Sequence, residues 1–399
     1  MTMTGPVRTT TTPSQGGGIG TPTLIALAML AAVAPFGIDL YLSAFPAMTS
    51  DLSTSATGVQ LSLTAFLVGA GVGQVLFGPW SDRIGRMVPL LTGLAVFIAA
   101  SAVAVAAGSI EVLVIARLAQ GLGGAAGMVI GRAMILDRES GPAAARALNL
   151  MMMIGGVAPV VAPLTGSLLA DAIGWRGLLS IVGALGVLSL AATLAFVRES
   201  RPKAVRVAGA RGSWAGLLDR GYIGHVIAFG FGMAIMMAYI SASPFVYQEM
   251  IGLSAPMYGL AFAANAIGLV GATAISSRLA RRFSIRALAA AGLVISLAAV
   301  LVILILTLTG APAAWLMPPL FLAIAPLGLV FGNATALALS AVPPAATGAA
   351  SAFLGLLQFV LAGIVAALVG DGSTLPLALT MLTAAVVALL GLALGRARA

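Results

Sequence analysis

Cysteine is absent from the 399-residue sequence, and histidine and lysine occur once each, as His225 and Lys203. The absence of cysteine excludes disulfides, thiol catalysis and Cys-ligated metals, and a single histidine leaves no cluster for zinc. No G-x-x-x-x-G-K-S/T motif occurs, so the chain has no phosphate-binding loop for ATP hydrolysis. We therefore expect no metal and no cofactor, and an energy source that is an ion gradient or a partner subunit.

Charged residues are also scarce: they make up 8% of the chain, whereas hydrophobic residues make up 60%. A soluble domain needs about a quarter charged residues to cover its surface, so the composition predicts a protein that crosses the membrane several times. The formal net charge of +9 does not indicate a nucleic-acid partner, because the basic residues fall in short loops and form no basic domain or helix. The partner that the composition predicts is the lipid bilayer.

Apolar runs of about twenty residues, the length of a membrane-spanning helix, follow one another along the chain. Six fit before residue 198 and six after residue 220, with the fifth and sixth near 145–171 and 175–197. This pattern predicts an all-α membrane protein with twelve transmembrane helices in two pseudo-symmetric six-helix bundles. The expected organisation is a flexible cytoplasmic tail 1–20, an N-terminal bundle 21–197, a cytoplasmic linker 198–220, a C-terminal bundle 221–395 and a cytoplasmic tail 396–399.

The charges between these runs predict the orientation. Loops on one side hold nearly all of the arginines. Loops on the other side hold one base, Arg176, and the acids Asp51, Glu111, Asp171, Glu249 and Asp371. Because arginine and lysine accumulate on the cytoplasmic side of membrane proteins, we expect both termini to lie inside.

A charged loop, GPWSDRIGR, separates the second and third runs and contains Gly78, Asp82, Arg83, Gly85 and Arg86. An ordinary positive cytoplasmic turn would explain the arginines, but it would not require the acid or the glycines. The loop resembles the signature loop between spans two and three of the major facilitator superfamily of secondary transporters. A weaker copy, SRLARR at 277–282, follows the eighth run, and this internal repeat supports two related halves.

Ionisable residues inside the apolar runs are few, and each costs about 2.5–3.5 kcal/mol at the bilayer centre. Asp39 in the first run and Arg117 in the fourth lie at a similar distance from the predicted outer ends, so they could share one cavity. Burial disfavours a charged carboxylate and a nearby cation favours it, so Asp39 in alternating surroundings could load and release a proton. The alternative is a structural cap, or a salt bridge to Arg117 that only holds spans together.

Arg117 begins the segment RLAQGLGGA, in which Gln120 falls one turn further along the helix. Because arginine does not titrate, Arg117 would either tune the pKa of a carboxylate or orient a water or substrate. The alternative is that Arg117 only forms hydrogen bonds between helices. The residues predicted to line a substrate cavity are Tyr41, Gln120, Met152, Tyr239 and Gln358. Methionine and aromatic side chains can form an adaptable cavity wall, although packing between helices or contact with lipid would use the same residue types.

The fifth run contains GGVAPVVAPLTG, which includes Pro159, Pro163 and Gly166. Prolines four residues apart lie on one helical face and remove two backbone donors, so the sequence predicts a bent, hinge-like helix. Such a helix suits the rocking of helices during alternating access. An irregular but static span is the alternative.

Segments along nearly the whole chain are similar to the bicyclomycin-resistance (Bcr/CflA) branch of twelve-span drug:proton antiporters. They are DLYLSAFPAM at 39–48, RLAQGLGGA at 117–125, GRAMILD at 131–137, APVVAPLTGSLL at 158–169, SASPFVYQEMIGLS at 241–254 and GAASAFLGLLQF at 348–359. The resemblance implies that Asp39 couples protons or substrate and that Arg117 is the arginine of the fourth span. It also implies that Pro159, Pro163 and Gly166 form the antiporter hinge.

The same resemblance makes the loop 78–86 a gate latch, in which Asp82 could face the positive N-terminus of a helix in the other half. Two positions depart from the branch: Ser43 replaces a more common proline, and Thr165 precedes Gly166 where the branch has a second glycine. These departures bear on substrate preference and not on the class of protein.

The resemblance implies a proton-coupled multidrug efflux transporter of the bacterial inner membrane that exports lipophilic antimicrobials, and we expect it to act as a monomer. The alternative is a proton-coupled transporter of a small metabolite such as a sugar or amino acid, which should require more charged or amide groups in the spans. An enzyme is not expected, because isolated acids with one histidine and no cysteine provide no nucleophile with a base. A non-transporting sensor would bind ligand without flux.

Overall fold

The structure, a computed structural model, describes residues 19–139, 141–200, 218–343, 346–369 and 373–395. The predicted tail 396–399, nearly all of the predicted tail 1–20 and most of the predicted linker 198–220 lie outside these ranges. The division into two bundles with those boundaries therefore stays a prediction.

Apolar sequence of helical length forms helices throughout the described ranges, which contain no strand. The first group of helices is α1 (Thr21–Asp39), α2 (Phe45–Asp51), α3 (Ala56–Ile84), α4 (Met87–Val105), α5 (Ile110–Arg138) and α6 (Gly141–Phe196). The second group is α7 (Arg220–Phe245), α8 (Ala255–Leu279), α9 (Ile285–Leu308), α10 (Met317–Ile324), α11 (Phe331–Ser340), α12 (Thr347–Leu368) and α13 (Thr374–Leu394). The all-α prediction is confirmed for these residues.

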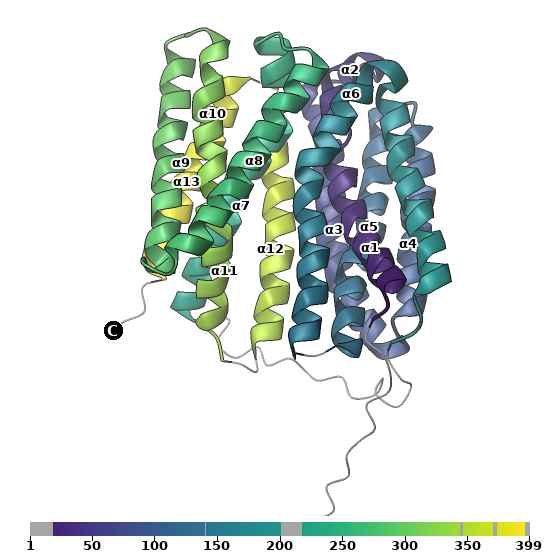
Figure 1. The fold of residues 1–399 in the computed structure, drawn as a ribbon. Helices are drawn as coiled ribbons and strands as arrows, with labels where there is room; N and C mark the ends of the chain where they lie inside the picture. Colours follow the sequence, from purple (N-terminus) through teal and green to yellow (C-terminus); the bar gives the residue numbers. More distant parts are fainter. Residues whose placement is uncertain (1–18, 140, 201–217, 344–345, 370–372, 396–399) are drawn as a thin grey trace, which may run out of the picture.

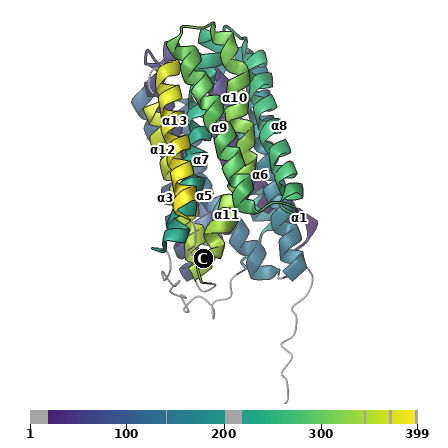
Figure 2. The same cartoon turned by 90° about the vertical axis from the view of Figure 1, so that its left-hand side faces the viewer.

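The first group of helices occupies one side of the molecule and the second group the other, with the long helices running roughly along one axis (Figure 1, Figure 2). The two groups meet where α12 packs on α3: a Cβ added to Gly363 would lie 2.9 Å from a methyl group of Val68. On the outside, large apolar side chains such as Ile115, Leu194 and Leu308 are 62–67% exposed. Such a surface suits contact with lipid and not with water.

Ten helices of the described chain are long and apolar enough to cross a membrane, and a shorter apolar stretch, Phe353–Val365, lies in α12. One of the ten, Val157–Phe196 in α6, has 40 residues, about twice the length that a bilayer requires. Gly174 interrupts it with φ of 63°, a conformation that favours glycine. The predicted count of twelve spans stays a prediction.

Two hydrogen bonds place the two ends of the part of α6 that follows Gly174. Trp175 Nε1 donates to Asp51 Oδ2 at 2.9 Å, at the end of α2. Thr23 Oγ1, in the first turn of α1, donates to the carbonyl oxygen of Phe196 at 2.8 Å. The part of α6 after Gly174 therefore runs from one end of the bundle to the other.

The two ends of the bundle carry different polar clusters. At one end, here named the Asp51 end, Arg176 pairs with Asp51 and its guanidinium lies 4.1 Å from the ring centroid of Trp175. At the other, here named the Arg86 end, Arg86 pairs with Asp137 at 2.8 Å. The charge pattern of the sequence predicts that the Asp51 end is the outer one.

Glycines set the close contact between α3 and α5. A Cβ added to Gly69 would lie 2.1 Å from the carbonyl oxygen of Leu118, and one added to Gly121 would lie 2.0 Å from the carbonyl oxygen of Phe66. Backbone meets backbone at both positions, as in small-residue helix contacts in membranes. This contact brings Phe66 of α3 close to α5, where it meets Arg117.

Candidate functional site

A cavity of about 230 Å³, here named the central cavity, lies between the two groups of helices. The helices that line it are α1, α3, α5 and α6 from the first group and α7, α8, α10 and α12 from the second. The described part of its wall is apolar except for four polar side chains, Asp39, Tyr239, Asn265 and Gln358. A pocket built from both groups is the arrangement expected of a transporter whose site lies between two halves.

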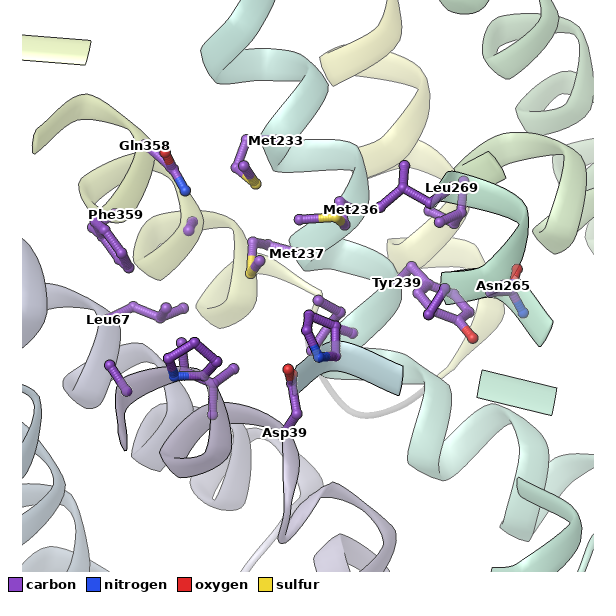
Figure 3. Close-up of a pocket in the computed structure, with 18 of the residues that line it drawn as sticks. Asp39, Leu67, Met233, Met236, Met237, Tyr239, Asn265, Leu269, Gln358 and Phe359 are labelled. Atoms are coloured by element: carbon purple, nitrogen blue, oxygen red, sulfur yellow. The ribbon is translucent and has the colours of Figure 1, made fainter. Parts of the chain in front are cut away.

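Asp39 is the last residue of α1, and its carboxylate points into the central cavity toward Met237 (Figure 3). The side chain is nearly buried, with 4% of its residue surface exposed, and its Oδ1 atom has no hydrogen-bond partner. Among the described residues that line the cavity there is no arginine, lysine or histidine and no other carboxylate. A buried carboxylate in this position is stabilised by a proton or by a cationic ligand.

Arg117 is fully buried but lies outside the lining of the central cavity. Its guanidinium is held between the rings of Tyr41 and Phe66, 4.4 Å from each centroid. Its Nη2 atom donates to the carbonyl oxygen of Gly37 at 2.6 Å, and its Nη1 atom donates to Gln120 Oε1. Arg117 therefore binds the last turn of α1, two residues before Asp39.

Tyr41 and Gln120 belong to this same buried cluster and do not line the cavity. Gln120 Nε2 donates to Ser101 Oγ at 2.7 Å, and the Tyr41 hydroxyl lies 3.1 Å from Ser62 Oγ. None of the ion pairs seen among the described residues joins Asp39 to Arg117. Arg117 therefore joins α5 to α1 through its hydrogen bond to Gly37. Of Asp39, Arg117, Tyr41 and Gln120, Asp39 is the one that lines the central cavity.

Replacing Arg117 with alanine should destabilise the protein strongly. The variant leaves the buried carbonyl oxygen of Gly37 and the amide oxygen of Gln120 without the donor that Arg117 provides. Each hydrogen bond to a charged group contributes about 1.5–3 kcal/mol. We expect a lower unfolding temperature of the detergent-solubilised protein for Arg117→Ala, with Arg83→Ala, which removes an exposed arginine, as the matched control. An unchanged unfolding temperature for Arg117→Ala would contradict the assignment.

Tyr239 and Gln358 line the central cavity as predicted from the sequence, on α7 and α12 (Figure 3). Tyr239 is stacked on Phe262 with ring centroids 5.6 Å apart. The side chain of Met152 lies outside the described part of the chain. Sequence reasoning did not select Met128 and Ile324, which also line the cavity, because nothing distinguishes them from other apolar residues of their spans.

The hinge residues predicted in α6 lie beside the cavity and beside α1. Pro159 lines the central cavity, and a Cβ added to Gly166 would lie 1.8 Å from the carbonyl oxygen of Leu40. Pro163 lies inside the helix one turn after Pro159. The segment is therefore in position to move the end of α1 that carries Asp39, and its action as a hinge stays a prediction.

The charged loop is organised around Arg86 at the Arg86 end. Gly78, Asp82 and Arg83 belong to α3, and Gly85 ends that helix with φ of 104°. The buried guanidinium of Arg86 pairs with Asp82 and Asp137, at 2.8 Å each, and its backbone N–H donates to Glu199 Oε1 at 2.9 Å. Burial lowers the pKa of Arg86, but the two carboxylates outweigh it and hold the pKa above its usual value.

Contacts between the two groups of helices close the Asp51 end. Gln248 Nε2 donates to the carbonyl oxygen of Ser43 at 2.9 Å, and the rings of Phe45 and Phe245 lie 6.0 Å apart. In this conformation Asp82 is paired with Arg86 of its own group. The latch contact predicted for Asp82 across the halves stays a prediction.

A family model described as the Major Facilitator Superfamily matches residues 27–367. The chain is 34% identical over 370 residues to the uncharacterized MFS-type transporter YdgK of Bacillus subtilis (strain 168), covering 90% of this chain and 92% of that protein. It is 26% identical to a bicyclomycin resistance protein homolog of Haemophilus influenzae, covering 87% and 88%. It is 32% identical to a chloramphenicol resistance protein of Pseudomonas aeruginosa, covering 62% and 59%.

Solved structures show the same fold at low identity. A bacterial homolog of the human lysosomal transporter Spinster, in an inward-facing and occupied conformation, matches with a TM-score of 0.76 at 17% identity, covering 95% of this chain and 97% of that one. A D-xylose–proton symporter matches with a TM-score of 0.71 at 16% identity, covering 91% and 96%. Family model, relatives and fold agree with the loop motif at 78–86: the chain belongs to the Major Facilitator Superfamily and is a multi-pass membrane transporter.

Proposed function

We propose that the chain is a proton-coupled multidrug efflux transporter of the bacterial inner membrane, which exports lipophilic antimicrobials by alternating access. The observation that carries the proposal is the central cavity, which lies between the two groups of helices and is apolar around one buried carboxylate. Relatives named for bicyclomycin, chloramphenicol and multidrug resistance support it. The chain is then a transporter and not an enzyme, and its energy source is the proton gradient.

The cavity wall suits ligands of varied shape. Four methionines, Met128, Met233, Met236 and Met237, line it together with aromatic rings, and methionine side chains adapt to different surfaces because they are unbranched and polarisable. Because Asp39 is the one charged side chain among the described residues of the wall, the electrostatics favour neutral and cationic solutes. Anions should be excluded by the same charge.

A cavity closed at the predicted outer end fits the state that takes up drug from the cytoplasm or the inner leaflet. After release outside, a proton bound to Asp39 would return inward and reset the protein. One charge that crosses the membrane potential contributes about 2.3 kcal/mol per 100 mV. This energy supports a drug gradient of about fiftyfold, since 1.4 kcal/mol corresponds to tenfold.

Transport of a sugar or amino acid is the second candidate. A polar solute needs several hydrogen-bonding groups in its site, whereas the described wall of the central cavity has four polar side chains, Asp39, Tyr239, Asn265 and Gln358. The likeness to a D-xylose–proton symporter concerns the fold alone. The composition of the cavity therefore favours lipophilic substrates.

The proposal includes twelve spans, with both termini in the cytoplasm and the protein acting as a monomer. The two parts of α6 on either side of Gly174 would count as two crossings, and α12, with its shorter apolar stretch, would supply another. The side of the membrane at which each end lies rests on the distribution of arginines.

Accumulation of drugs in cells tests the proposal. Cells that lack other drug exporters would express the protein and be loaded with a lipophilic cation, a neutral lipophilic antibiotic and a lipophilic anion of similar size. We expect lower accumulation of the cation and the neutral compound, abolished by an uncoupler, and unchanged accumulation of the anion. Equal accumulation of all three with and without the protein would overturn the proposal, and proton-coupled flux of a sugar or amino acid would favour the second candidate.

A further inference from the structure

Gln358 differs from the other polar side chains of the central cavity in its exposure. Asp39 and Asn265 are each 4% exposed and Tyr239 is 2% exposed, whereas Gln358 is only partly buried. The Tyr239 hydroxyl and Asn265 Oδ1 are buried atoms, and Asn265 Nδ2 donates to the carbonyl oxygen of Ala261 in its own helix at 2.8 Å. Of the three neutral side chains, Gln358 is therefore the one that presents its polar group to the open part of the cavity.

The packing of α12 determines the direction in which Gln358 projects. On one flank, Leu361 meets α7, because a Cβ added to Gly230 would lie 2.7 Å from Leu361 Cδ1. On the other flank, Phe359 meets α3, because a Cβ added to Gly71 would lie 3.2 Å from Phe359 Cβ. With 3.6 residues per turn, Gln358 projects between these two flanks and lines the central cavity (Figure 3).

Gln358 and Asp39 form two separate polar positions in the wall. They belong to α12 and α1, one helix from each group, and they lie apart in Figure 3. No hydrogen bond of the Gln358 amide group is seen within the part of the chain that the structure describes. Both polar groups are thus available to a ligand, and the methionine side chains are part of the wall that they share.

An amide and a carboxylate select different ligands. The glutamine amide has an oxygen acceptor and two N–H donors and carries no charge, so it can bind a hydroxyl, amide or carbonyl group. A carboxylate attracts a cation through its charge. A neutral drug that buries a polar group against an apolar wall loses hydrogen bonds to water, and a partner in the wall is needed to replace them.

We propose that Gln358 is the specificity-determining residue for neutral substrates that carry hydroxyl or amide groups, whereas Asp39 is the contact for lipophilic cations. The inference rests on the proposed function, because it requires the central cavity to be the drug site. Specificity is a difference between affinities, and here each class of substrate gains its affinity from a different polar group. One apolar cavity then binds both classes.

Equilibrium dialysis of the purified protein with two labelled probes tests the proposal. Chloramphenicol is neutral and carries an amide and two hydroxyl groups, whereas tetraphenylphosphonium is a lipophilic cation without a hydrogen-bonding group. Gln358→Met removes the amide and keeps an unbranched side chain of similar length. We expect Gln358→Met to bind chloramphenicol about tenfold more weakly than the wild type, and tetraphenylphosphonium with the wild-type Kd.

Two further variants separate the hydrogen bond from the shape of the cavity. Gln358→Asn keeps an amide group, so it should bind chloramphenicol more tightly than Gln358→Met does. Asp39→Asn should show the reciprocal pattern, with weaker binding of tetraphenylphosphonium and unchanged binding of chloramphenicol.

The contradicting results are distinct. Wild-type binding of chloramphenicol by Gln358→Met would overturn the role of Gln358. An equal loss of both probes in Gln358→Met would also overturn it, because the substitution would then act through the shape of the cavity. Failure of the wild type to bind either probe would overturn the proposed function itself.

Accessibility gives an independent measurement, because the chain contains no cysteine. The single thiol of Gln358→Cys should react with a small methanethiosulfonate reagent faster than the single thiol of Asn265→Cys, since Asn265 is buried and Gln358 is partly exposed. An equal or slower reaction of Gln358→Cys would show that the position does not face the open part of the cavity, and it would overturn the proposal.

Discussion

Asp39→Asn should abolish the concentration of drug by an imposed proton gradient, while drug binding persists. The amide has nearly the shape of the carboxylate and keeps the cavity wall intact, but it cannot take up and release a proton. Drug should then only equilibrate, so the ratio of drug concentrations across a proteoliposome membrane falls from about fiftyfold per 100 mV toward one. The measurement is the steady-state drug ratio in proteoliposomes of equal protein content.

Glu111→Gln is the matched control for this prediction, because Glu111 is an exposed acid in the first turn of α5, away from the central cavity. It should transport as the wild type does. Neutral drugs should bind Asp39→Asn with wild-type affinity, whereas lipophilic cations should bind more weakly because the countercharge is lost. A wild-type drug ratio in Asp39→Asn would show that another group carries the proton.

Gly121→Ala should prevent stable assembly of α3 against α5. The new methyl group would lie 2.0 Å from the carbonyl oxygen of Phe66, a backbone atom that cannot rotate away. Overpacking costs about 1–3 kcal/mol and in some cases more, and the shift of α3 would also disturb Phe66 beside Arg117. We expect little folded protein, measured as the monodisperse fraction after solubilisation in mild detergent.

Gly271→Ala provides the comparison. Gly271 lies inside α8, and no other atom lies within 4 Å of the position that a Cβ would take. Alanine favours helix over glycine by about 0.5–1 kcal/mol, so this variant should be as stable as the wild type or more so. Equal yields of folded protein from Gly121→Ala and Gly271→Ala would contradict the packing of α3 on α5.

Helices and their breaks follow from the sequence because an apolar run in lipid must satisfy its own backbone hydrogen bonds. The fifth and sixth runs, predicted at 145–171 and 175–197, meet where α6 is interrupted at Gly174. The predicted depths of Asp39 and Arg117 also agree with the structure, since Arg117 binds the carbonyl of Gly37, close to Asp39. Position along a helix is readable from spacing alone.

Which neighbouring helix a side chain faces is set by the packing of the helices, and the spacing of residues in the sequence does not reveal it. Arg117 and Asp39 share a depth, but Arg117 faces Tyr41 and Phe66 while Asp39 faces the helices of the second group. Gln120 also lies away from the cavity, because it packs against Arg117 and Ser101, to which it is hydrogen-bonded. Of the residues predicted to line a substrate cavity whose side chains the structure describes, Tyr239 and Gln358 reach the central cavity, and both lie on helices of the second group.

The closure at the Asp51 end was not predicted at all. Gln248 binds the carbonyl of Ser43 across 205 residues of sequence, and neither residue is charged inside a span or belongs to a periodic pattern. Contacts of this kind depend on how the two groups of helices meet, which changes between conformations of a transporter. The structure supplies one such arrangement, in which contacts between the two groups of helices close the Asp51 end.

The most direct test of the account is drug-induced proton release from acidified everted membrane vesicles that contain the protein. Addition of a lipophilic cationic or neutral antimicrobial should release protons from wild-type vesicles, and vesicles with Asp39→Asn should release none. Export of drug without proton release from wild-type vesicles would contradict the central claim that Asp39 exchanges a proton for drug in the central cavity.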